Sequence, residues 1–335
     1  MIFLIQKTLI FTIPLLIVAL AGMFAERSGI INIALDGIMI FGSFVGAVGA
    51  FLLRRIPFFV DHNQLTFVLA MLIAAVAGAL FSLLLSFSAI KLKADQTIGG
   101  TALNMLAPAV ALFLIKVFFS MDRLEMVPAV NSAGQTKDFG FVVLNGDLGP
   151  VGRTFFDKAY ISTFIAIGLY ILLSILIYKT KTGLRLRSCG EHPQAAASVG
   201  IDVNKMRYLG TTISGALAGF GGYIYIATVA NGTAEGTVAG MGFLALAIMI
   251  FGNWKPVGIA LGALLFGFLK CISVIYSQLS ITIDGEKVFF LKNLNLPMYF
   301  YNLVPYIAVL IVLAFTSKRS RAPKAEGIPY DKGAR

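Results

Sequence analysis

The chain has 335 residues, of which 58% are hydrophobic and 13% charged, and its mean hydropathy is +0.87. These values lie outside the range of soluble globular domains and indicate an integral membrane protein. The net charge of +11 would suit a nucleic-acid partner, but the sequence carries no nucleic-acid-binding motif, and most of its basic residues fall in loops between apolar runs.

Nine apolar runs follow one another, and most approach or exceed the ~20 residues that a helix needs to cross a bilayer. They lie at roughly 8–24, 30–53, 65–90, 98–120, 159–178, 208–229, 236–252, 256–279 and 299–316. The run at 236–252 opens with two glycines and a threonine, so it is either a full crossing or a broken, re-entrant segment. We predict an all-α, polytopic membrane protein with about nine transmembrane helices, a single domain at 1–316 and a basic tail at 317–335.

The loops fall into two sets that differ in charge. One set holds 16 basic and 6 acidic residues and consists of 25–29, 91–97, 179–207, 253–255 and the tail at 317–335. The other holds 9 of each sign and consists of 1–7, 54–64, 121–158, 230–235 and 280–298. Lys and Arg collect on the cytoplasmic side of membrane proteins, so we expect the first set, including the C-terminus, to be cytoplasmic and to meet anionic lipid or a partner protein.

Two polar residues interrupt the second run. Asn32 and Asp36 are four residues apart, so on a helix they would share one face. A carboxylate in the middle of a bilayer costs ~2.5–3.5 kcal/mol, so this face should point into the bundle or a watery cavity. Two interpretations stay open: the pair lines a translocation path, or it ties a helix break to its neighbours through hydrogen bonds.

A second polar stripe opens the fourth run. Thr97, Thr101 and Asn104 lie at i, i+4 and i+7 and would share one helix face. The stripe either contacts a substrate or bonds a neighbouring helix. Further along, the loop at 121–158 is long for a loop without structure of its own, which suits either a docking surface for an external protein or flexible filler.

The loop at 179–207 is the most informative of the basic loops. Its middle, from Gly190 to Gly200, is typical of a short helix of small residues, with Pro193 in the first turn and Gly200 just past the end. A compact helix held on the basic side of a membrane protein is suited to a soluble partner. This feature favours a transporter that is driven by another protein.

The chain lacks the motifs of an enzyme. It contains no G-x-x-x-x-G-K-[ST] phosphate loop, and its two histidines have no companions at metal-ligand spacing. We therefore expect no catalytic residues, no metal site and no cofactor.

Three segments in combination resemble the membrane permeases of ABC importers: ERSGIINIALDGIMIFGSF, QTIGGTALNMLA and GLRLRSCGEHPQAAASVGIDVNKMRYLGTTISGALAGFGG. The resemblance covers about residues 8 to 316. It is to the branched-chain amino acid, ribose and nucleoside permease superfamily, and within it to the shorter permease subunit of nucleoside importers. It implies the type II importer fold and alternating access, and it leaves ribose-like sugars and branched-chain amino acids as alternative substrates.

The resemblance also implies partners in a bacterial cytoplasmic membrane. These are a second, dissimilar permease subunit, a cytoplasmic ATPase with two nucleotide-binding domains, and an extracytoplasmic substrate-binding lipoprotein. By the same resemblance the segment from Glu191 to Gly200 is the coupling helix that sits in a groove of the ATPase. The residues expected to mediate coupling are Arg187, Gly190, Glu191, Ala195, Ala196 and Gly200.

Two other classes of function remain. An ion-coupled secondary transporter would use Asp36 or Lys270 to carry a proton or an ion and would need no ATPase. A scaffold or channel subunit would show no substrate dependence, and the loop at 121–158 would be its working part.

Overall fold

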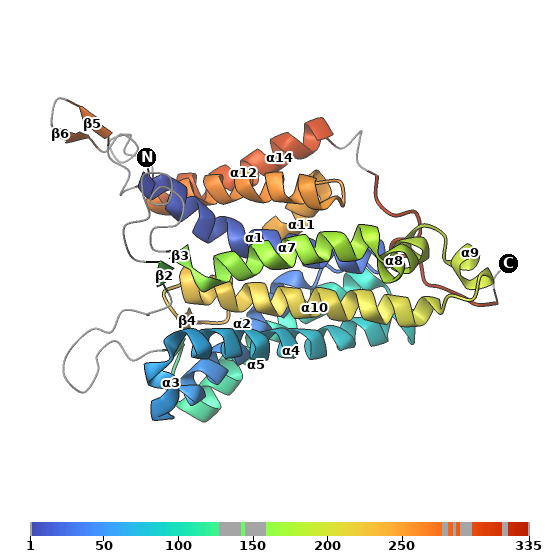
Figure 1. The fold of residues 1–335 in the computed structure, drawn as a ribbon, viewed down its shortest axis with the longest axis horizontal. Helices are drawn as coiled ribbons and strands as arrows, with labels where there is room; N and C mark the ends of the chain where they lie inside the picture. The colour runs from blue at the N-terminus through green and yellow to red at the C-terminus, as the bar shows by residue number, and fades with distance from the viewer. Residues whose placement is uncertain are drawn as a thin grey trace.

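The structure is a computed structural model that describes residues 2–126, 142–144, 159–276, 281–283, 286–288, 297–316 and 321–333. Most of these residues are helical, and the longer helices run along one common direction (Figure 1). The helices are α1 (Ile2–Arg27), α2 (Leu35–Leu53), α3 (Pro57–Asp61), α4 (Asn63–Ile90), α5 (Gln96–Phe119), α7 (Ile161–Lys179), α8 (Lys181–Glu191), α9 (Pro193–Ser198), α10 (Val203–Thr228), α11 (Met241–Phe251), α12 (Pro256–Ile275) and α14 (Met298–Thr316).

The short strands of the described residues form antiparallel pairs. They are β1 (Leu124–Glu125) with β4 (Thr233–Ala234), β2 (Val142–Leu144) with β3 (Ala159–Tyr160), and β5 (Ile281–Ile283) with β6 (Glu286–Val288). These pairs lie at the end of the bundle where α1 begins (Figure 1).

Each of the nine apolar runs contains a helix, and six described helices are long and apolar enough to cross a membrane: α1, α2, α4, α5, α7 and α12. The run at 236–252 yields only the 11 residues of α11, which span ~16 Å, about half of the bilayer core. Helix α10 has 26 residues but is rich in glycine and hydroxyl side chains. The chain is thus a multi-pass, mostly helical protein with six candidate spans in its described part.

Helix α10 tolerates its polar composition because other helices surround it. It packs against α1, α2 and α4, and every residue from Leu217 to Ala227 is buried. A Cβ at Gly219 would overlap the Ala74 carbonyl oxygen of α4, and one at Gly42 of α2 would overlap the Gly219 Cα. Small residues therefore let three backbones approach closely, as in other membrane bundles.

The described parts of the two loop sets that differ in charge lie at opposite ends of the bundle, as the sequence predicted. Helices α8 and α9 and the C-terminus lie at one end, whereas α3 and the strand pairs lie at the other, with the start of α1 (Figure 1). Contacts within the basic set support this division, because Arg27 pairs with Glu191 and Lys93 with Asp331.

Candidate functional site

The break between α1 and α2 spans residues 28–34, and side chains from other helices hold it in place. The Ile31 backbone N–H donates to Gln96 Oε1 (2.7 Å), and Asn32 Nδ2 donates to Ser214 Oγ of α10 (2.8 Å). Asn32 is fully buried and lies outside any helix. The prediction that Asn32 and Asp36 share a helix face is therefore wrong, because the chain leaves the helix after Arg27 and resumes it only at Leu35.

Asn104 of α5 bonds both sides of this break. Its Oδ1 accepts from the Gly37 backbone N–H (2.7 Å), and its Nδ2 donates to the Ile33 carbonyl (2.9 Å). One amide side chain thus satisfies a donor at the start of α2 and an acceptor in the break, groups that would be costly to leave unpaired inside a membrane.

Asp36 accepts a hydrogen bond from the start of another helix. Its Oδ1 accepts from the backbone N–H of Gly242, in the first turn of α11 (2.9 Å). A carboxylate is well suited to this place, because a helix N-terminus presents unpaired N–H groups and a positive dipole end. Lys270 does not pair with Asp36; its Nζ lies over the ring of Tyr306, 5.6 Å from the centroid.

The polar stripe of Thr97, Thr101 and Asn104 lies in two different environments. Thr97 and Thr101 are exposed on α5, and Thr101 Oγ1 donates to the Thr97 carbonyl (2.8 Å). Asn104 is half-buried and turned toward α2. The exposed face of α5 also carries large apolar side chains, with Ile98 and Met105 more than 70% exposed.

At the opposite end of the molecule from the strand pairs, the expected short helix is present but begins later than predicted. Residues Gly190 and Glu191 end α8, the chain turns at His192, and α9 covers only Pro193–Ser198. His192 Nδ1 accepts from the Ala195 N–H (3.3 Å). Gly200 donates its N–H to the Ala197 carbonyl (3.0 Å) and lies just past the helix end, as the sequence predicted; its φ of +83° is the left-handed conformation common at that position.

Helix α9 has an inner and an outer face. Ala196 is 3% exposed and packs with Cys189 and Val203, so it belongs to the core of this loop. Ala195 and Val199 point outward, and Val199 is 74% exposed. The outer face is completed by Gln194 and Ser198.

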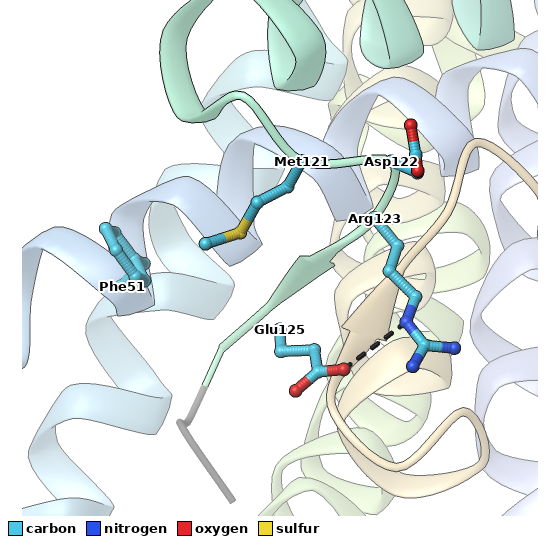
Figure 2. A pocket seen from close by; sticks show the side chains of 5 residues that line it. All are labelled: Phe51, Met121, Asp122, Arg123 and Glu125. Atoms are coloured by element: carbon cyan, nitrogen blue, oxygen red, sulfur yellow. Dashed lines mark ion pairs between the residues drawn. The ribbon is translucent and has the colours of Figure 1, made fainter.

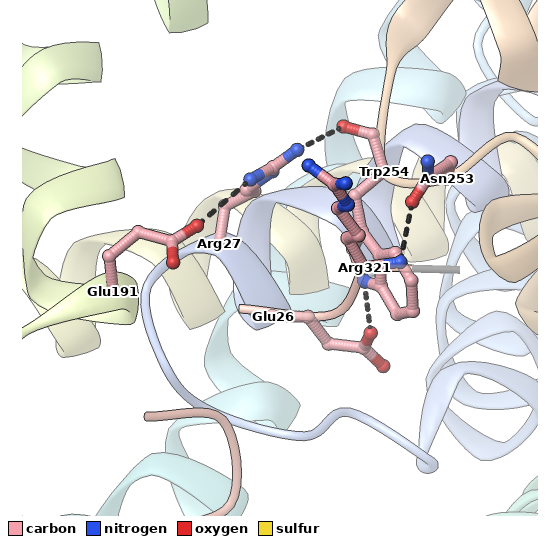
Figure 3. A network of polar contacts seen from close by, with 6 residues as sticks. All are labelled: Glu26, Arg27, Glu191, Asn253, Trp254 and Arg321. Atoms are coloured by element: carbon pink, nitrogen blue, oxygen red, sulfur yellow. Dashed lines mark hydrogen bonds and ion pairs between the residues drawn. The ribbon is translucent and has the colours of Figure 1, made fainter. Parts of the chain in front are cut away.

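Arg27 joins α8 to the end of α1 and to the turn before α12. Its Nη1 pairs with Glu191 Oε1 (3.4 Å), and its Nη2 donates to the Trp254 carbonyl (3.1 Å). Trp254 Nε1 in turn donates to Glu26 Oε2 (2.5 Å), as Figure 3 shows. Gly190 is needed here, because a Cβ at that position would overlap the Arg27 carbonyl oxygen.

Arg187 of α8 stacks on Tyr178 of α7. Its guanidinium lies 4.9 Å from the centroid of the Tyr178 ring, and its Nε is buried without a hydrogen-bond partner among the described residues. Glu191 keeps about half of its side chain exposed beside its ion pair, so its carboxylate is accessible to another protein.

The C-terminal segment 321–333 packs under this end of the bundle, a contact that the sequence did not predict. Its hydrogen bonds to the bundle include Ala325 N–H to the Gly190 carbonyl (2.8 Å), Gly327 N–H to the Gly29 carbonyl (3.2 Å), Arg207 Nη1 to the Ile328 carbonyl (3.0 Å) and Arg321 N–H to Asn253 Oδ1 (2.8 Å). The segment contributes a backbone atom to each of these bonds, so the pattern of its side chains could not have revealed them.

Comparison with known proteins identifies the family. A family model described as "Branched-chain amino acid transport system / permease component" matches residues 4–313. The chain belongs to this permease family. No solved structure matches it.

Curated relatives of the permease align with it over nearly its whole length. The chain is 39% identical to the guanosine ABC transporter permease protein NupQ of Bacillus subtilis over 99% of this chain and 97% of the relative. It is 37% identical to the nucleoside ABC transporter permease protein NupC of Lactococcus lactis over 98% and 96%. NupB, also from Lactococcus lactis and a nucleoside ABC transporter permease protein, is 25% identical over 94% and 83%.

The end of the permease opposite α9 carries a pocket of about 710 Å³. Its lining includes Phe51, Met121 and the ion pair of Arg123 Nε with Glu125 Oε1 (3.3 Å; Figure 2). Only residues 121–126 and 142–144 of the predicted external loop at 121–158 are described, so most of that docking prediction lies outside the described residues.

Proposed function

We propose that this permease is one membrane subunit of an ATP-driven ABC importer that carries nucleosides into a bacterial cell. The observation that carries the proposal is the similarity to NupQ and NupC over at least 96% of both chains in each comparison. In this assignment the end with α9 and the C-terminus is cytoplasmic, since its loops hold 16 basic and 6 acidic residues.

Coupling runs through α9 in this proposal. A cytoplasmic ATPase with two nucleotide-binding domains receives the outer face of α9, where Ala195 lets the helix seat closely and Glu191 offers a carboxylate beside it. Closure of the domains on ATP displaces α9 and α8. The ion pair of Glu191 with Arg27 then transmits the displacement to α1, which favours one of two orientations of the membrane helices.

The substrate path follows the face where α5, α11 and the break before α2 meet. A second, dissimilar permease subunit covers the exposed side of α5 and completes the path, and a substrate-binding lipoprotein delivers the nucleoside from outside. Thr97 and Thr101 offer hydroxyl groups on that side, while Asn32, Asp36 and Asn104 hold the backbone around it. With α10 and α14 as further crossings and α11 as a re-entrant segment that reaches about halfway, the type II arrangement has about nine membrane segments.

The test is uptake of labelled adenosine, uridine, ribose and leucine by cells that lack this chain and by cells complemented with it, each with and without ATP depletion. The expected result is restored, ATP-dependent uptake of the nucleosides alone. Uptake that survives ATP depletion and collapses with a protonophore would instead assign an ion-coupled transporter. Restored ribose or leucine uptake would reassign the substrate within the family.

A further inference from the structure

A basic cavity of about 580 Å³ lies beside the end of α8, where the end of α1 meets the turn before α12 and the C-terminal segment. Four cationic residues line it, Arg27, Lys255, Arg321 and Lys324, together with Glu191 and Asn253. Figure 3 shows how the backbone of Arg321 is fixed there, because its N–H donates to Asn253 Oδ1 (2.8 Å).

The positive charge of the cavity is not balanced from within. Glu191 pairs with Arg27, and no carboxylate of the described chain forms an ion pair with Lys255, Arg321 or Lys324. The Nε of Arg27 is buried and has no hydrogen-bond partner among the same residues. Several donors with a surplus of positive charge are the chemistry that an anion requires of a binding site.

An apolar surface begins where the cavity ends. Lys255 directly precedes α12, and from Val257 onward that helix exposes large apolar side chains at i, i+4, i+7, i+8 and i+11. These are Val257 (67% exposed), Leu261 (63%), Leu264 (45%), Leu265 (41%) and Phe268 (38%). The spacing places them on one helix face that runs away from the charged cavity.

We propose that the cavity binds the phosphate head group of an anionic phospholipid whose acyl chains lie along this face of α12. A soluble phosphate would match the cations but not the apolar face, and a zwitterionic lipid would match the face but not the surplus charge. The site is built from α1, α12 and the C-terminal segment together, so bound lipid holds that segment against the bundle. The proposal depends only on the membrane location of the chain and not on the substrate.

The experiment uses the full chain in neutral detergent and counts bound lipid by native mass spectrometry. Phosphatidylglycerol, phosphatidylcholine and glycerol 3-phosphate are titrated separately. The test variant combines Lys255→Gln, Arg321→Gln and Lys324→Gln. The control combines Lys91→Gln, Lys181→Gln and Lys205→Gln, which remove the same charge from exposed positions of other basic loops.

We expect the wild-type chain and the control to bind phosphatidylglycerol in preference to phosphatidylcholine. The test variant should lose ~tenfold or more in affinity for phosphatidylglycerol, since each cation near an anionic head group contributes to binding. Equal loss in the control, or none in the test variant, would overturn the proposal. So would glycerol 3-phosphate binding as tightly as phosphatidylglycerol, because the site would then serve a soluble anion.

Discussion

Two interruptions of helical structure differ in how the chain uses their polar groups. The break before α2 is buried, and side chains of α5 and α10 bond its backbone and Asn32. The turn between α8 and α9 lies at the surface, where His192 bonds the start of α9 and the outer face of that helix is exposed. A buried break must satisfy its polar groups internally, whereas a surface turn keeps side chains free for another protein.

Because of this difference, we expect the buried break to matter for stability and the surface turn to matter for coupling to the ATPase. Substitutions at the buried break should lower the stability of the permease, and substitutions on the outer face of α9 should lower transport at unchanged stability. A variant that breaks either rule would show that the two interruptions are not divided in this way.

Replacing Asn104 with Leu should be the most damaging change to stability. It leaves the Gly37 N–H and the Ile33 carbonyl without their partner, at a cost of ~2–6 kcal/mol for two groups. Thermal unfolding of the purified protein measures the loss. The control is Thr101→Val, on the exposed side of the same helix, which should unfold within a few degrees of wild type.

Asp36→Ala should cost ~1–2 kcal/mol, because it removes the acceptor at the start of α11. Asp36→Asn keeps an oxygen acceptor and should recover most of that loss. Both variants should be compared by unfolding and by ATP-dependent uptake. Equal stability of the Ala variant and the wild type would show that α11 does not depend on this bond.

Docking of the C-terminal segment, which lies next to the surface turn, should weaken as pH rises. Burial raises the pKa of the Glu326 carboxyl above its ordinary value, and the hydrogen bond with Glu26 and the charge of Arg27 offset this only in part. A carboxyl whose pKa is higher in the docked segment than in the free segment binds its proton more tightly when the segment is docked. It therefore stabilises docking fully below its ordinary pKa, and this contribution is lost as the pH rises through the raised pKa. After correction for the intrinsic exchange rate, hydrogen exchange of residues 321–333 should therefore be slower at low pH.

The Glu326→Gln variant provides the control for that pH dependence. It cannot ionise at position 326, so the corrected exchange of the segment should lose most of its response to pH. An unchanged response would assign the effect to another group.

Ala195→Trp should change stability least, by less than ~0.5 kcal/mol, because its side chain is exposed. It should nevertheless abolish uptake, since the larger side chain would keep α9 from seating in the ATPase. The matched variant Ala196→Trp overfills a buried position and should destabilise the protein by ~1–3 kcal/mol. Wild-type uptake by Ala195→Trp would contradict the coupling role of α9.

Much of this architecture could be predicted from local patterns. The apolar runs located the long helices but not α8, the charge count divided the loops between the two ends, and Pro193 and Gly200 marked the short helix. Local patterns failed where a neighbour decides the conformation. Asn32 leaves the helix where Ser214 and α5 bond the break, and Gly190 ends α8 where it passes against the Arg27 carbonyl.

Hydropathy, charge and a few residues with restricted backbones were enough to establish the class of protein, the positions of its long helices and the ends at which its loops lie. The packing of the helices was needed to learn which polar groups are used internally. It showed that Asp36 bonds the start of α11, that Asn104 bridges the break, and that Ala196 faces inward while Ala195 faces outward. Hydrogen bonds between residues distant in sequence depend on how the helices pack, and no local pattern encodes that packing.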